Sequence, residues 1–167
     1  MRNLIKKVLR EESKSMDMVY FWKNSPKVND PTDQKQMDDF MWYLIEYVDF
    51  PSDGNYRRIE HFIEGLINYG LIDYDLYLKM YRWMTLKFRV LHGLMEKENL
   101  ESRLTNVGSD DSYSDWSWHV LSLGRKTFEG VLNMDEDELN YVLNLEPIES
   151  FGYGWPHPFD IKERQQS

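Results

Sequence analysis

The sequence contains no cysteine among its 167 residues. This absence excludes disulfide bonds and thiolate metal sites, and it favours a reducing compartment. Long hydrophobic runs are also absent, because no stretch reaches the roughly 18 apolar residues that a transmembrane helix requires. Residues 1–12 are charged and amphipathic, and they lack the apolar stretch and cleavage site of a secretory signal. We therefore expect a cytoplasmic protein without a membrane span.

Several motifs that carry chemistry are missing as well. The sequence has no glycine-rich phosphate loop, no RNA-binding aromatic motif and no recognisable nucleophile motif. No histidine has a second histidine at metal-ligand spacing; the histidines are His61, His92, His119 and His157. The sequence therefore predicts no catalytic residues, no cofactor and no bound metal.

Basic residues are in the minority: 20 lysines and arginines stand against 29 aspartates and glutamates, which gives a net charge of −9. Residues 1–14 hold five basic and two acidic side chains, whereas residues 106–167 hold four basic and twelve acidic ones. An acidic body repels a phosphate backbone, so nucleic acid is a disfavoured partner. The charge suits a basic protein surface, a cation or simple solubility, and the sequence does not choose among these three.

The chain is rich in residues that build a core, with 41% hydrophobic and 15% aromatic residues, and its length suits one globular domain. Apolar residues recur at helical spacing in several segments, without a pair of strands or an internal repeat. These segments are 37–48, 59–67, 77–95, 111–123, 125–133 and 135–145. We therefore predict an all-α fold, a compact bundle of about five or six helices with an N-terminal helical extension.

Two regions are predicted along the chain. Residues 1–36 hold a short amphipathic helix over 3–12 and a linker over 24–35. This helix suits either docking to a partner or membrane surface, or packing on its own domain. Residues 37–167 form the helical domain. Its tail over 149–160 is too rich in glycine, proline and aromatic residues for a helix, and the aromatic side chains are expected to pack back onto the bundle.

The most specific stretch is residues 108–132, which read GSDDSYSDWSWHVLSLGRKTFEGVL. Ser109, Asp110 or Asp111 can cap the helix that follows, Gly124 breaks that helix, and a short helix resumes at Arg125. Beyond this stretch, Asp135 and a glutamate three residues later form a capping box that opens another helix.

This stretch resembles a bacterial and phage family known as domain of unknown function 4240. The shared pattern is a glycine, a serine, two aspartates and an aromatic residue, followed by a helix and a Gly-Arg corner. The residues that carry it are Gly108, Ser109, Asp110, Asp111, Ser112, Tyr113, Gly124, Arg125 and Phe128, with weaker matches at Met41, Trp42, Leu44, Ile45, Ser150 and Phe151. The likeness covers residues 37–153. It departs from the pattern at Met41, where the family usually has an aromatic residue, and at Trp118 and His119. The family has no established activity, so the resemblance implies a fold and no mechanism.

Four residues of this stretch are candidate ligand contacts. Asp110 and Asp111 either cap the helix or leave one carboxylate to bind a cation or a ligand amine or hydroxyl. His119 follows Asp115 by four residues, which suits an acid–base pair or an ordinary surface pair. Arg125 either pairs with a carboxylate such as Asp111 or faces a cleft, where it would bind phosphate or carboxylate.

Aromatic residues suggest a second kind of site. Trp116 and Trp118 cannot share a helix face, so we predict one in the core and the other partly exposed. Trp118, Tyr153 and Trp155 are candidates for an aromatic patch, which marks protein interfaces or stacking platforms for bases. The acidic surroundings favour another protein as the partner.

The sequence as a whole predicts a non-enzymatic protein-interaction or binding protein, phage-encoded and acting on a host protein in the host cytoplasm. The first alternative is an enzyme that binds or processes a small ligand or nucleotide at Asp110–Arg125. The second alternative is a structural phage component that docks through residues 1–14. The oligomeric state is not predicted.

Overall fold

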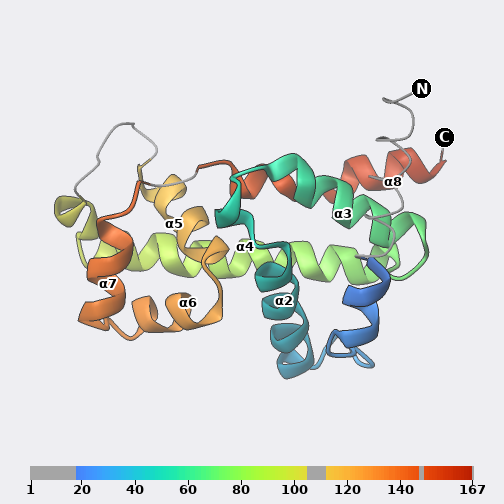
Figure 1. Ribbon diagram of the computed structural model, residues 1–167, viewed down its shortest axis with the longest axis horizontal. Helices are drawn as coiled ribbons and strands as arrows, with labels where there is room; N and C mark the ends of the chain where they lie inside the picture. The colour runs from blue at the N-terminus through green and yellow to red at the C-terminus, as the bar shows by residue number, and fades with distance from the viewer. Residues whose placement is uncertain (1–17, 105–111, 147–148, 167) are drawn as a thin grey trace.

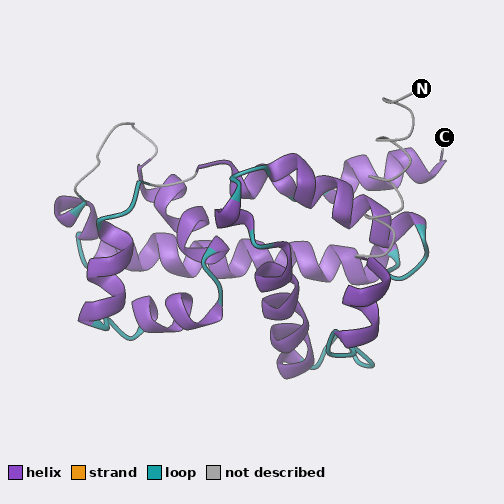
Figure 2. Cartoon of the chain, viewed as in Figure 1, coloured by secondary structure: helices purple, strands orange, loops and turns teal. Residues whose placement is uncertain are grey.

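The computed structural model describes residues 18–104, 112–146 and 149–166 of the chain. Every regular element among these residues is a helix, and they contain no strand (Figure 2). The all-α prediction is therefore confirmed. The elements with stated bounds are α2 (Gln34–Val48), η1 (Phe50–Ser52), α3 (Tyr56–Asn68), α4 (Tyr74–Lys97), η2 (Leu100–Arg103), α5 (Ser112–Ser122), α6 (Arg125–Leu132), α7 (Glu136–Leu143), η3 (Glu149–Gly154) and α8 (Pro158–Gln166). The α-helices are slightly more numerous than the five or six predicted.

Helix α4 organises the molecule. It is 24 residues long and runs along the long axis, with α5, α6 and α7 at one end and α2, α3 and α8 at the other (Figure 1). Helices α2, α5 and α8 all contact it directly. The buried side chains of α4 recur at helical spacing, as its apolar stripe predicted; they are Tyr77, Met80, Trp83, Met84, Leu91 and Met95.

Three helix ends are fixed by residues next to them in the sequence, among them the predicted capping box at Asp135. The Asp73 carboxylate accepts a hydrogen bond from the backbone N–H of Leu76 and caps α4. Asp135 caps α7 by accepting from the second and third residues of that helix. After α3, Gly70 adopts a φ of +68°, and the N–H of the next residue, Leu71, bonds the carbonyl of Leu66. This is the left-handed helix termination that glycine permits.

Residues 18–24 are helical and belong to the same core as α2 and α3. The Phe21 ring is fully buried and lies 5.2 Å from both Tyr47 and Phe62, between centroids. Phe40 meets it edge-on at 5.9 Å. Ring packing of this kind adds to the free energy gained by burying the apolar surface. The predicted helix over 3–12 lies outside the described residues.

Most of the tail over residues 149–160 is helical, and the prediction that it forms no helix was wrong: η3 covers Glu149–Gly154 and α8 begins at Pro158, with residues 155–157 between them. Pro158 occupies the first position of α8, where a missing N–H costs no hydrogen bond. The His157 side chain accepts from the N–H of Phe159 through Nδ1 at 3.2 Å and so supports the start of the helix. Of the tail aromatics, Phe151 and Trp155 are buried, whereas Tyr153 and Phe159 are exposed. Packing onto the bundle therefore holds for two of the four.

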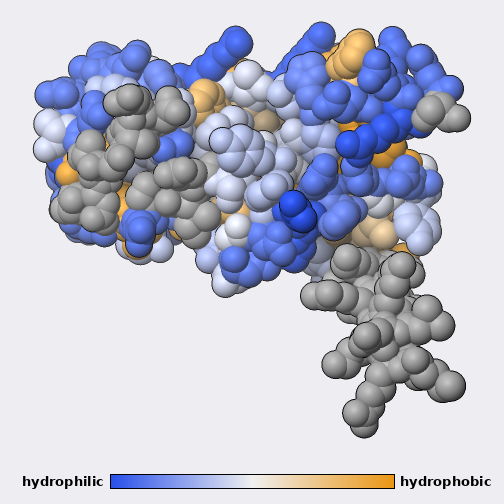
Figure 3. Space-filling model, turned by 90° about the horizontal axis from the view of Figure 1, so that it is seen from above, coloured by the Kyte–Doolittle hydropathy of each residue, from blue (hydrophilic) through white to orange (hydrophobic). Residues whose placement is uncertain are grey.

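Apolar side chains are mostly sequestered in one continuous core. The face shown in Figure 3 is largely hydrophilic, with hydrophobic groups in separate patches. Within the described residues, no helix is both long and apolar enough to cross a bilayer.

Candidate functional site

The two predicted ligand residues that the structure describes, His119 and Arg125, lie on either side of the break between α5 and α6. Asp110 and Asp111 lie outside the described residues. Helix α5 ends at Ser122, and α6 begins at Arg125 after Gly124, whose φ of +96° favours glycine. The break that the sequence placed at Gly124 is therefore confirmed.

Arg125 docks this corner onto α2. Its backbone N–H donates to Glu46 at 3.1 Å, and its guanidinium bonds Asp39 at 3.1 Å. The Nε atom donates to Glu129 one turn later at 2.7 Å. The hydrogen bond from Lys35, with a smaller contribution from Arg125, holds the pKa of Asp39 below its usual value. Arg125 thus joins α2 to α6, and its predicted role as a ligand contact stays a prediction.

Replacing Gly124 by alanine is expected to reduce the free energy of unfolding by roughly 1–3 kcal/mol. The added Cβ would lie 3.1 Å from the Glu46 side chain, on a backbone that L-residues rarely adopt. Gly93→Ala is the matched control, since a Cβ there meets nothing within 4 Å and α4 gains about 1 kcal/mol from the better helix former. Urea unfolding measures both. Equal effects of the two substitutions would contradict the assigned corner geometry.

His119 lies in the interior of the fold. It is 3% exposed, and burial lowers its pKa from 6.5 to about 4. The side chain is therefore neutral near pH 7. As with Arg125, no direct test bears on its predicted role in ligand binding.

The two tryptophans of α5 divide as predicted. Trp116 is buried, and Trp118 is partly exposed. Trp118 stacks on Phe88 of α4 with centroids 4.4 Å apart and lies closely over Gly152. Tyr153 is exposed, but Trp155 is buried in the core. The aromatic side chains of this region therefore serve mainly to join α4, α5 and η3, and the predicted patch stays a prediction.

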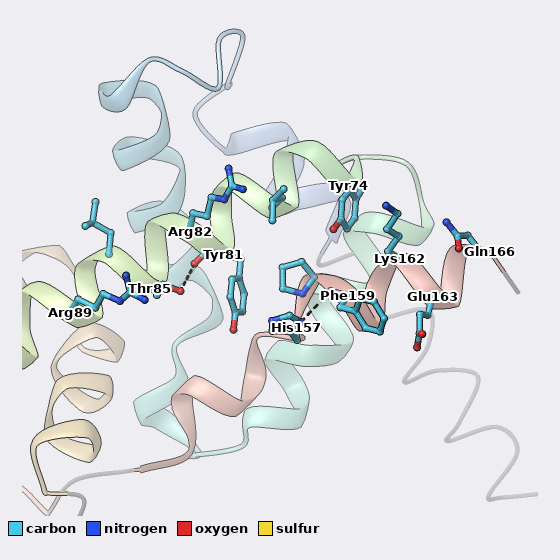
Figure 4. Close-up of a pocket in the computed structure, with 13 residues that line it drawn as sticks. Tyr74, Tyr81, Arg82, Thr85, Arg89, His157, Phe159, Lys162, Glu163 and Gln166 are labelled. Carbon is cyan, nitrogen blue, oxygen red and sulfur yellow. Dashed lines mark hydrogen bonds between the residues drawn. The ribbon is translucent and has the colours of Figure 1, made fainter.

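A groove of about 920 Å³ lies between α4 and α8 (Figure 4). Tyr81 from α4 and His157, just before α8, point toward one another, with ring centroids 5.5 Å apart. Lys162 of α8 approaches the ring of Tyr74, with Nζ 6.0 Å from its centroid. Phe159 lines the groove beside them and is 59% exposed. The size is within the range of ligand and peptide sites.

Three interactions anchor α8 and the segment just before it to α4, to α3 and to the core. The buried Tyr77 hydroxyl of α4 donates to the carbonyl of Pro156 at 2.6 Å, and burial raises the pKa of Tyr77. The Ile161 side chain of α8 is buried. Arg164 forms an ion pair with Glu64 of α3. The groove is therefore bounded on both sides by anchored helices.

The charge of the groove is opposite to that of the whole chain. Arg82, Arg89 and Lys162 line it together with a single carboxylate, Glu163. Within the described residues, neither Arg82 nor Arg89 has an ion-pair partner. Leu86 lies between them on α4 with 56% of its surface exposed. An apolar side chain flanked by cations can bind a partner that is apolar and anionic.

The sequence predictions did not include this groove. Its α8 wall begins within the tail over 149–160 that was predicted to be non-helical and continues to Gln166. The available signal was the spacing of Arg82, Leu86 and Arg89, which places them on the outer face of α4, away from the core residue Met84.

No group of three or more histidine, aspartate or glutamate side chains within the described residues has an arrangement that could hold a metal ion. Comparison of the chain with protein-family models, curated proteins and solved structures finds no match. The resemblance described above for residues 37–153 stays a prediction.

Proposed function

We propose that this protein is a non-enzymatic protein-interaction protein whose binding surface is the groove between α4 and α8. The observation that carries the proposal is the local reversal of charge: a chain of net charge −9 lines this groove with Arg82, Arg89, Lys162 and only one acidic residue. Because Arg82 and Arg89 form no ion pair within the described residues, their guanidinium groups are available to bind an external partner. Exposed Leu86 and Phe159 supply apolar contact area beside them.

A ligand-processing site at Asp110–Arg125 receives less support from the described residues. Arg125 is bonded to Asp39 and Glu129, and His119 is buried. Both residues contribute to folding as they stand. The resemblance to a bacterial and phage family, which we retain as a proposal, makes a bacterial protein the natural partner to seek.

Affinity capture tests the proposed function. The immobilised full-length protein, the double variant Arg82→Glu/Arg89→Glu and the control Lys23→Glu/Arg57→Glu would be exposed to the same bacterial lysate. Both variants exchange two exposed positive charges for two negative ones, and Lys23 and Arg57 do not line the groove. We expect a protein that wild type and control retain and that the groove variant loses, by quantitative mass spectrometry.

Two results would contradict the proposal. One is an identical set of captured proteins for all three chains, with each variant shown to be folded by its melting temperature. The other is capture of no specific protein together with thermal stabilisation of the wild type by a nucleotide or a divalent cation, since ligand that binds only the folded state raises the melting temperature.

A further inference from the structure

We propose that the groove between α4 and α8 binds an acidic amphipathic helix of a partner protein. This inference rests on the proposed function and specifies the chemistry of the bound segment. Three features carry it: the charge of the lining, the spacing of charge and apolar surface along α4, and the helical walls.

The charge selects an anionic segment. Arg82 and Arg89 have no ion pair within the part of the chain that the structure describes, and Lys162 of α8 lines the same groove as a third cation. A carboxylate that binds either arginine gains charge-assisted, bidentate hydrogen bonds. Residues 1–14 of this chain are a poor occupant, since their five basic and two acidic side chains give them the same sign of charge as the groove.

The spacing on α4 matches the repeat of a helix. Arg82 and Arg89 are seven residues apart, so they lie on one side of α4, about 10 Å apart along its axis. Leu86 lies between them, and the exposed Val90 continues the apolar surface by one turn. A partner helix with two carboxylates two turns apart, and apolar side chains between them, would reach both arginines and cover Leu86.

The walls favour a helix over an extended strand. A strand gains affinity by pairing with an exposed sheet edge, and the described residues contain no sheet. Two anchored helices instead form a trough, with the apolar ring of Phe159 on one side and Leu86 on the other. This is the arrangement that receives the apolar face of an amphipathic helix.

The test uses two labelled peptides of about 18 residues, long enough to form helix. Both carry leucine at helical spacing on an alanine background, and their flanking positions are glutamate in one and lysine in the other. Fluorescence anisotropy with the full-length protein is expected to show binding of the glutamate peptide. Arg82→Glu/Arg89→Glu should weaken that binding by roughly tenfold or more and improve binding of the lysine peptide. Lys23→Glu/Arg57→Glu should leave both affinities within about twofold, since a distant exposed charge acts only through a screened field.

Several outcomes would overturn the inference. One is equal affinity of the glutamate peptide for the wild type and for the groove variant. Another is that the wild type binds the lysine peptide, or a labelled single-stranded DNA, more tightly than it binds the glutamate peptide. A third is self-association of the wild type that the groove variant loses. If a lysate protein is captured through Arg82 and Arg89 while the glutamate peptide does not bind, the inference fails and the proposed function stands. If the groove variant changes neither capture nor peptide binding, both fail.

Discussion

Replacing Phe21 by alanine is expected to reduce the free energy of unfolding by about 3–5 kcal/mol. The ring is fully buried against α2 and α3, so its removal loses transfer free energy and leaves a cavity. Urea unfolding, followed by circular dichroism, measures the loss, provided that the unfolding free energies of wild type and variant depend equally steeply on urea concentration. A typical domain of this size is only about 5–15 kcal/mol stable, so the variant would be close to unfolding at elevated temperature.

Tyr20 provides the matched control for Phe21. It is the preceding residue, is 60% exposed and stacks only loosely on Tyr47, with centroids 6.3 Å apart. Tyr20→Ala is therefore expected to cost about 1 kcal/mol or less. If Phe21→Ala costs no more than Tyr20→Ala, residues 18–24 do not belong to the core.

His119 is expected to make the protein less stable as the pH falls from 6.5 toward 4. Burial lowers its folded pKa to about 4, whereas the unfolded chain has the ordinary value of 6.5. Between these values the unfolded state binds the proton and the folded state does not, so the stability contributed by neutral His119 is fully present above pH 6.5 and declines below it. Integrated over the window, the loss amounts to about 3 kcal/mol.

The variant His119→Gln isolates this contribution, because the amide does not titrate. Unfolding free energies would be measured between pH 7 and pH 4 for the wild type, for His119→Gln and for the exposed-site control His61→Gln. The wild type and the control should lose about 3 kcal/mol more than His119→Gln over this range. Parallel pH profiles for all three would show that burial of His119 does not set the acid sensitivity.

Much of the fold was predictable because its signals are local. The spacing of apolar residues predicted α2, α3 and α4, and the capping box at Asp135 predicted the start of α7. Helix α8 was missed because composition argued against it. Pro158 is compatible with a first turn, and the remaining support comes from Tyr77 and Glu64, distant residues that no local pattern connects to the tail.

The candidate site was less predictable because it depends on which segments meet. The sequence singled out Arg125 and His119 as candidate ligand contacts. Arg125 bonds Asp39 on α2 and His119 is buried in the core, so their environment could not be inferred from spacing. The groove residues Arg82 and Arg89 lie within an ordinary amphipathic helix. What distinguishes them is tertiary: α8 packs beside them, and neither has an ion-pair partner among the described residues.

An amide hydrogen-exchange footprint of the complex tests the central proposal most directly. The full-length protein would be measured alone and with the partner obtained by affinity capture, since bound segments exchange more slowly. We expect added protection over residues 78–90 of α4 and over α8, and no change in α6 and α7. Protection confined to α5, α6 and α7, with the α4–α8 groove exchanging as in the free protein, would contradict the assignment of the groove as the binding site.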